Sequence, residues 1–160
     1  MTIQVGDKIP HTTFTKPGEG GLEAVDSDSY FAGRKVALFA VPGAFTPTCS
    51  AKHLPGFIEK AGELKAKGID EIACTSVNDA FVMGAWAKTS STGETVTMLA
   101  DGNGTFAEAV GLTMDGSKFG MGTRSQRYSM LIDNGVVTQL NVEGPGEFKV
   151  SSAEYMLAQL

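Results

Sequence analysis

The residue of this chain best suited to covalent chemistry is Cys49. It lies in the segment VPGAFTPTCSAKHLPGF, residues 41–57, which follows an apolar run and precedes an amphipathic one. A cysteine thiolate is a nucleophile, and the first turn of a helix stabilises it through unpaired N–H groups and the positive end of the helix dipole. Pro47 is suited to a first helical turn, so Cys49 is predicted to lie at such a helix start. Because cysteine is also often a small buried hydrophobe, these residues alone leave a reactive and an inert thiol equally open.

The other cysteine of the chain is Cys74, and the two histidines are His11 and His53. Two cysteines do not make a disulfide framework, and these four residues show no spacing typical of a metal site, so we expect no metal and no cofactor. Cys74 lies midway through EIACTSV, residues 71–77, where a structural thiol is the favoured interpretation and pairing with Cys49 the alternative. A disulfide needs Cα atoms within about 7 Å, which a mid-strand residue is not expected to satisfy without local unfolding.

The elements that would position Cys49 can be predicted from the hydrophobic pattern. KVALFAV, residues 35–41, is apolar and β-prone, which predicts a central strand buried on both faces. The helix that carries Cys49 should be bent or interrupted at Pro55 and should end at Gly68. If the strand is parallel to its neighbours, Cys49 lies beyond its carboxyl end, where ligands bind in open α/β sheets.

The rest of the chain alternates predicted strands and helices. We expect β segments over residues 12–15, 22–25, 71–77 and 97–99, and helices over about 78–86 and 104–110. TMDGSKFGMGTR, residues 113–124, is predicted to be a glycine-rich surface loop.

The C-terminal part carries a strong hairpin signal. Strands over RYSMLI and VVTQLNV flank Asp133-Asn134-Gly135. Ser151 and Glu154 form a predicted capping box for a last helix that ends near Gln159. The order of elements indicates one α/β domain over residues 1–160, with a central mixed sheet flanked by helices.

Composition and charge exclude several classes of protein. With 160 residues and 42% hydrophobic content, the chain is typical of one soluble globular domain. The net charge of −5 is spread along the chain without a basic stripe, so no nucleic-acid partner is expected. The apolar stretch of residues 36–41 is too short to span a membrane, and the N-terminus lacks the pattern of a signal peptide. We therefore expect a cytoplasmic protein without a membrane partner.

The segment of residues 42–49 matches Pro-x-x-x-Thr-x-x-Cys, the signature of peroxiredoxins, with Pro42, Thr46 and Cys49 at its fixed positions. The longer segment PGAFTPTCSAKHLPGF resembles the type II, peroxiredoxin-5-like group. The likeness extends to ACTSVNDAFVMGAWAK, LADGNGTFAEAVGL, GTRSQRYSMLID and GEFKVSSAE. The resemblance is greatest to the plant and bacterial glutaredoxin-dependent members. It implies a thioredoxin-like fold and a thiol-dependent peroxidase that reduces hydrogen peroxide and alkyl hydroperoxides in antioxidant defence and redox homeostasis.

The resemblance also implies catalytic roles for four residues. Cys49 would attack the terminal oxygen of the peroxide and become a sulfenic acid. Thr46 would offer its hydroxyl to the thiolate and the peroxide, and Pro42 would shield the sulfur from water. Arg127, in QRYSM, matches the active-site arginine of the family; a fixed cation lowers the pKa of a nearby thiol from its ordinary value near 8.5 and so raises the reactive fraction.

Two neighbours of these positions have no role in the family pattern. Arg124, three residues before Arg127, is expected to be a solvated loop charge, with a supporting role at the site as the less favoured alternative. His53, four residues after Cys49, would share its face on a continuous helix. Since Pro55 weakens this geometry and the family chemistry needs no histidine base, packing or capping is the favoured interpretation of His53.

The region before the last helix reads EGPGEFKVSSAE and lacks the resolving cysteine that mammalian relatives carry there. The likeness to members that use an external thiol implies glutathione with glutaredoxin as the reductant, or thioredoxin as the second choice, with no glutaredoxin module fused in this chain. The family also favours a homodimer with the active-site loops near the interface. Phe45, Phe81 and Phe119 could line such an interface or an apolar approach to Cys49.

Two other functions are kept as hypotheses. A peroxide-sensing redox-switch binding protein would use oxidation of Cys49 to change a partner contact. A thioredoxin-type dithiol oxidoreductase is disfavoured, because the segment of residues 46–49 has Thr46 where a Cys-x-x-Cys motif needs its first cysteine.

Overall fold

The central sheet of the molecule combines parallel and antiparallel strands. The computed structural model describes residues 2–18 and 20–160, and there its larger sheet has seven strands in the order β2-β1-β5-β4-β3-β8-β9. The strands are β1 (Thr13–Gly18), β2 (Gly21–Asp26), β3 (Lys35–Ala40), β4 (Glu71–Ser76), β5 (Thr97–Ala100), β8 (Tyr128–Asp133) and β9 (Val136–Val142). β3, β4 and β5 are parallel to one another, and the outer strands pair antiparallel.

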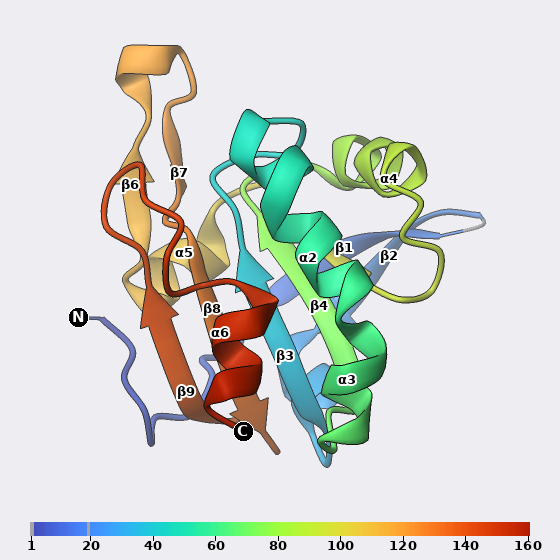
Figure 1. The fold of residues 1–160 in the computed structure, drawn as a ribbon. Coiled ribbons are helices and arrows are strands. Elements are labelled where there is room, and N and C mark those ends of the chain that lie inside the picture. The colour runs from blue at the N-terminus through green and yellow to red at the C-terminus, as the bar shows by residue number, and fades with distance from the viewer. Residues whose placement is uncertain (1, 19) are drawn as a thin grey trace.

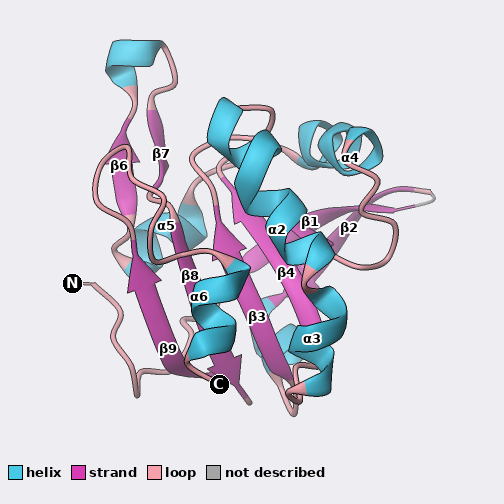
Figure 2. Ribbon diagram, in the orientation of Figure 1, coloured by secondary structure: helices cyan, strands magenta, loops and turns pink. Residues whose placement is uncertain are grey.

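Helices cover both faces of this sheet (Figures 1 and 2). One face is covered by α2 (Leu54–Glu59), α3 (Ala61–Ala66), α4 (Ala80–Thr89) and α6 (Ala153–Ala158), and the other by α1 (Ser27–Phe31) and α5 (Thr105–Val110). The mixed sheet flanked by helices that the sequence predicts is therefore confirmed.

The strand β3 lies at the centre of the core, as predicted for residues 35–41. Ala37 and Phe39 pack in the hydrophobic cluster under α2 and α4, whereas Val36, Leu38 and Ala40 pack in the cluster under α5. This alternation follows from the two-residue period of a strand, and it explains why a strand covered on both sides is apolar at every position.

The helix after β3 is irregular in the turn before Pro55, whereas the predicted bend or interruption at Pro55 itself is not seen: Pro55 lies in the first turn of α2, and the break between α2 and α3 falls at Lys60. Helical geometry begins at Pro47, runs as the π-helical turn η1 (Cys49–His53), and becomes α-helical at Leu54. Pro55 has no N–H to donate within the helix, which disfavours regular α-helical bonding one turn earlier. The helical region ends before Gly68, whose positive φ of 95° suits glycine at a helix C-terminus.

Residues 113–124, predicted to be a surface loop, instead form most of a small second sheet. In it β6 (Thr113–Asp115) pairs antiparallel with β7 (Thr123–Ser125) around the short 3₁₀ turn η2 (Ser117–Phe119). The prediction was wrong because the strands have only three residues each, too few to show alternation among the surrounding glycines.

The prediction for the cap of the last helix was wrong by one position. Ser152, not Ser151, is the N-cap of α6, and its hydroxyl oxygen accepts the N–H of Tyr155. Ser151 is fully buried, and its hydroxyl donates to Glu143 instead. The helix α6 ends at Ala158 with Gln159 as C-cap, close to the predicted end.

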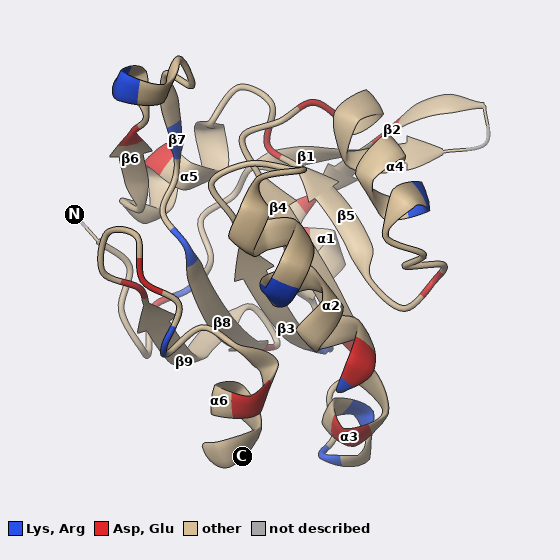
Figure 3. Ribbon diagram, turned by 45° about the horizontal axis from the view of Figure 1, so that its top comes forward, with Lys and Arg blue, Asp and Glu red and all other residues tan. Residues whose placement is uncertain are grey.

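Other predicted elements agree with the structure. Asp79 caps α4 through a bond from the N–H of Val82. Asn134 and Gly135, at the β8–β9 turn, both have positive φ, of 49° and 80°, as a tight hairpin turn requires. Acidic and basic positions are interspersed over the described chain, without a basic stripe (Figure 3). Within the described residues, none of the helices has both the length and the apolar character needed to cross a membrane.

Candidate active site

Cys49 lies beyond the carboxyl end of β3, in the first turn of the helix that begins at Pro47. The neighbouring strand β4 is parallel to β3, so the carboxyl ends of both strands meet at this edge of the sheet. The Cys49 side chain is fully buried in the cluster between the sheet and α2. The sequence prediction for its placement is thus confirmed.

The hydroxyl of Thr46 is the first polar group at the sulfur. Its Oγ1 lies 2.7 Å from Sγ of Cys49 and 2.8 Å from the carbonyl oxygen of Gly43. A hydroxyl carries one hydrogen, so Thr46 can donate to only one of these atoms at a time. It donates to the sulfur when that is a thiolate, and to Gly43 when the thiol S–H donates to Thr46.

The guanidinium of Arg127 is the second polar group at the sulfur. Its Nη2 donates to Sγ of Cys49 at 3.0 Å, and its Nη1 donates to Nδ1 of His53 at 2.9 Å. Arg127 directly precedes β8, which is antiparallel to β3 with Tyr128 opposite Ala40. This register brings Arg127 to the end of β3, beside Cys49, from which it is 78 residues away in the sequence.

His53 is held in one neutral form. Its Nε2 lies 2.9 Å from the carbonyl oxygen of Ser151, which can only accept, so Nε2 carries the hydrogen and Nδ1 accepts from Arg127. Burial and the Arg127 cation lower the pKa of His53 to about 3. The expectation of packing or capping missed this bond to Arg127, because the partner is distant in sequence.

Pro42 is half-buried and lies beside Arg124. Nη1 of Arg124 donates to the Pro42 carbonyl oxygen at 3.2 Å, and its Nε donates to that of Met121 at 2.9 Å. Arg124 is therefore half-buried and bound at both ends of its guanidinium. The expectation of a solvated loop charge was wrong, because the hairpin β6–β7 carries Arg124 against the Pro42 turn.

A cavity of about 570 Å³ opens next to these residues. Pro42 and Arg127 form part of its wall, together with the apolar residues Met114, Phe119 and Pro145. A larger cavity of about 780 Å³ lies at the opposite end of the sheet, beside Glu71 and Thr97 at the starts of β4 and β5. The chemistry described above is closer to the smaller cavity, because Arg127, which donates to the sulfur, is part of its wall and not of the larger one.

Cys74 lies in the middle of β4, opposite Phe39 of β3, and is fully buried. Both cysteines are free thiols. Burial raises the pKa of the Cys74 thiol well above its usual range, so that thiol stays protonated at neutral pH.

Trp86 of α4 contacts the helix start from the other side. Its indole N–H donates to Oγ of Ser50 at 3.0 Å, and its ring lies 6.5 Å from that of Phe45. Phe45 is half exposed and has a positive φ of 65°, an unusual backbone conformation for a bulky residue.

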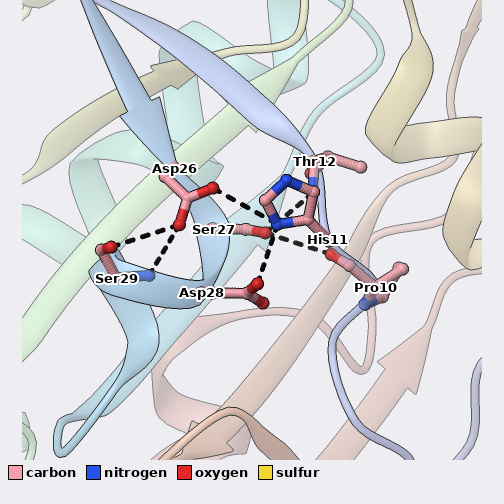
Figure 4. Close-up of polar contacts among 7 residues, drawn as sticks. All are labelled: Pro10, His11, Thr12, Asp26, Ser27, Asp28 and Ser29. Carbon is pink, nitrogen blue, oxygen red and sulfur yellow. Dashed lines mark hydrogen bonds and ion pairs between the residues drawn. The ribbon is translucent and has the colours of Figure 1, made fainter.

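Three potential metal ligands meet away from this site, where the sequence suggested none (Figure 4). Nδ1 of His11 lies 2.8 Å from Asp28 and 3.3 Å from Asp26, and all three side chains are well exposed. Asp26 also caps α1 by accepting the N–H of Ser29. A hydrogen bond with Asp28 and the charges of both carboxylates raise the pKa of His11. An exposed ion pair at a helix cap accounts for this arrangement.

Comparisons with known proteins agree on one family. The model of the family described as Redoxin matches residues 4–157. Peroxiredoxin-2E-2, chloroplastic, of Oryza sativa subsp. japonica is 57% identical over 99% of this chain and 73% of its own length. Peroxiredoxin-2D of Arabidopsis thaliana is 54% identical over 99% of this chain and 98% of its own. The crystal structure of reduced Prx3 in complex with H₂O₂ from Vibrio vulnificus has a TM-score of 0.95 and 54% identity, covering 99% of both chains.

Proposed function

This chain belongs to the Redoxin family and is a type II peroxiredoxin, a thiol-dependent peroxidase with a thioredoxin-like fold, and from this premise we propose that Cys49 is the cysteine that reduces the peroxide. One observation carries the proposal. Two hydrogen-bond donors, Oγ1 of Thr46 and Nη2 of Arg127, lie within 3.0 Å of Sγ of Cys49. Donors fixed in this way stabilise a thiolate and the charge that develops on the oxygens it attacks.

The reaction follows from these roles. The Cys49 thiolate attacks the terminal oxygen of the peroxide, a sulfur–oxygen bond forms, and the oxygen–oxygen bond breaks. The leaving hydroxide or alkoxide takes a proton and departs as water or alcohol. Cys49 is left as a sulfenic acid. Arg127 and Thr46 donate to the oxygens as charge moves onto them, and Pro42 keeps water from the sulfur.

The substrates we propose are hydrogen peroxide and alkyl hydroperoxides. Hydrogen peroxide needs only the space between the donors. The cavity next to Pro42 and Arg127 has the apolar side chains of Met114, Phe119 and Pro145 on its wall, which offers an alkyl group a place outside water.

The reductant we propose is an external thiol, glutathione with glutaredoxin first and thioredoxin second. Cys74 is the other cysteine of the chain, and its position inside β4 and its raised pKa do not suit an attack on the Cys49 sulfenic acid. A reducing compartment such as the cytoplasm would keep both thiols free. By family likeness we also propose a homodimer.

The test is a peroxidase assay with glutathione alone, with glutathione and glutaredoxin, and with thioredoxin. We expect repeated turnover in at least one system, abolished by Cys49→Ser and retained in the matched variant Cys74→Ser. A Cys49→Ser protein that still consumed peroxide at the normal rate would overturn the proposal. Oxidation of Cys49 without recycling by any of the three would instead favour a peroxide sensor.

A further inference from the structure

Glu143 carries a buried carboxylate just after β9, and it lines the same cavity as Pro42 and Arg127. Its side chain accepts the backbone N–H groups of Lys149, Val150 and Ser151 and also the Ser151 hydroxyl, at 2.7 to 2.9 Å. Burial alone would raise the pKa of Glu143, but these hydrogen bonds outweigh it and lower that pKa, so the group is ionised at neutral pH. The carboxylate thus closes residues 143–151 into a fixed loop.

This loop contacts the partner of Arg127. The carbonyl oxygen of Ser151 accepts the Nε2 hydrogen of His53, and Glu143 holds both the N–H and the hydroxyl of that same serine. The position of the Ser151 carbonyl decides which imidazole nitrogen carries the hydrogen. It therefore decides whether Nδ1 of His53 can accept from Arg127.

The same loop contacts Arg127 in two further ways. The backbone N–H of Glu143 donates to the carbonyl oxygen of Arg127 at 2.9 Å. The ring of Phe148 lies 5.0 Å from that of His53 and 5.9 Å from the guanidinium carbon of Arg127. The loop that Glu143 closes thus contacts the backbone, the guanidinium and the acceptor of Arg127.

We propose that Glu143 is a positioning residue for the peroxidase reaction, which acts through Ser151 and His53 to aim the Arg127 guanidinium at the Cys49 sulfur. The inference rests on the proposed role of Cys49. Glu143 itself does not touch the reacting atoms. Because a neutral imidazole stands between the carboxylate and the guanidinium, Arg127 is oriented without a carboxylate bound directly to it.

The first experiment compares Glu143→Gln and Glu143→Ala with the wild type. The glutamine oxygen can still accept from Ser151, but its amide group would face the N–H of Lys149 and carries no charge. Since misplacing a catalytic group by about 1 Å can cost on the order of 100-fold, we expect rates of Cys49 oxidation by peroxide reduced about tenfold in Glu143→Gln and up to about 100-fold in Glu143→Ala. The ultraviolet absorbance of the thiolate, measured against pH, should move to higher pH in the same order.

Asp101→Asn is the control for a purely structural effect. Asp101 is also a buried carboxylate that accepts backbone N–H groups, those of Phe106 and Ala107, but these belong to the first turn of α5, on the opposite face of the sheet. We expect this variant to lower the melting temperature and to leave the rate and the thiolate titration unchanged. Equal behaviour of the Asp101 and Glu143 variants would overturn the inference.

A double-mutant cycle tests the route through His53. In His53→Asn, the side-chain oxygen can replace Nδ1 as the acceptor for Arg127, but the link to Ser151 is lost. In that background Glu143→Gln should slow the reaction by less than about twofold, because the effects of substitutions at interacting residues do not add. A full tenfold loss in both backgrounds would contradict the route.

If Glu143→Ala does not fold, the comparison of Glu143→Gln in the wild-type and His53→Asn backgrounds still tests the inference. The outcome is also separable from that of the proposed function. If wild-type protein fails to consume peroxide, Cys49 has been misassigned. If the wild type is active and Glu143→Gln reacts at the wild-type rate, only the role of Glu143 is refuted.

Discussion

At the scale of single residues, the glycine at position 43 leaves the space that the Arg124 side chain occupies. A Cβ atom at position 43 would lie 2.7 Å from Nη1 of Arg124, the nitrogen that donates to the Pro42 carbonyl. Side-chain atoms at that separation overlap, so one of them must move. The absence of a side chain at Gly43 thus allows the hairpin β6–β7 to hold the turn that contains Pro42.

We predict that Gly43→Ala displaces Arg124 and loosens the Pro42 turn. The clash is with the tip of a flexible side chain, which can move, so the free energy of unfolding in urea should fall by the loss of the hydrogen bond from Arg124 to Pro42, about 1 kcal/mol. Gly62→Ala is the matched control: nothing lies within 4 Å of its Cβ position on α3, and it should stabilise by about 0.5–1 kcal/mol. Equal stability of the two variants would contradict the contact.

The sequence pointed to Pro42, Thr46 and Cys49 through a local signature and to Arg127 through the family resemblance, and it missed the contacts that form only in the fold. Pro42, Thr46 and Cys49 lie within eight positions of one another, so their proximity is local. The bonds of His53 to Arg127 and Ser151 span 74 and 98 residues. No periodicity encodes such contacts, because the pairing of β3 with β8 and the packing of the last loop create them.

At the scale of elements, the turn η1 protects the sulfur and also limits access to it. Cys49 is fully buried within a helical segment, and its neighbour Ser50 is tied to α4. A glutathione thiol must reach bonding distance of the Cys49 sulfur to form a mixed disulfide. Residues 47–53 must therefore leave their helical arrangement during the cycle that we propose.

We predict that the glutathionylated protein has an open η1. Its backbone amides over residues 49–54 should exchange hydrogen at least about tenfold faster than in the reduced protein, because their intrahelical bonds are lost. Amides of β3 should be unaffected and serve as the internal control. Unchanged protection over residues 49–54 in the mixed disulfide would show that the thiol enters without opening the turn.

The elements that the sequence predicted are those with enough residues to show a period. The buried strands β3 and β4, and α4 with its Asp79 cap, have distinct patterns. The helix α1 has five residues, and β6 and β7 have three each, so their formation depends on tertiary contacts. Ser151 and Ser152 are both chemically able to cap α6, and only the bond of Ser151 to Glu143 decides between them.

At the scale of the whole molecule, the neutral state of His53 couples the site to global stability. The pKa of His53 is about 3 in the folded protein, against an ordinary 6.5. Between these values the unfolded chain binds a proton that the folded protein does not. The stabilisation is therefore present in full above pH 6.5 and is lost as the pH falls toward 3.

We predict that the free energy of unfolding decreases on acidification below pH 6.5 by up to about 1.4 kcal/mol per pH unit from this group. Urea unfolding between pH 4.5 and 7 should show this slope in the wild type and a shallower one in His53→Asn. His11, whose pKa is raised, contributes with the opposite sign but equally in both proteins. Identical slopes would mean that His53 is protonated in the folded state.

Trp86 is the one tryptophan of the sequence, and its indole N–H donates to Ser50, the residue that follows Cys49. The sequence therefore carries a single indole fluorophore, and it lies at the segment that we predict to open when Cys49 is oxidised and glutathionylated. Its emission reports on that segment alone, without background from other indoles. Indole emission would consequently time the steps that we propose at the sulfur, in unlabelled protein.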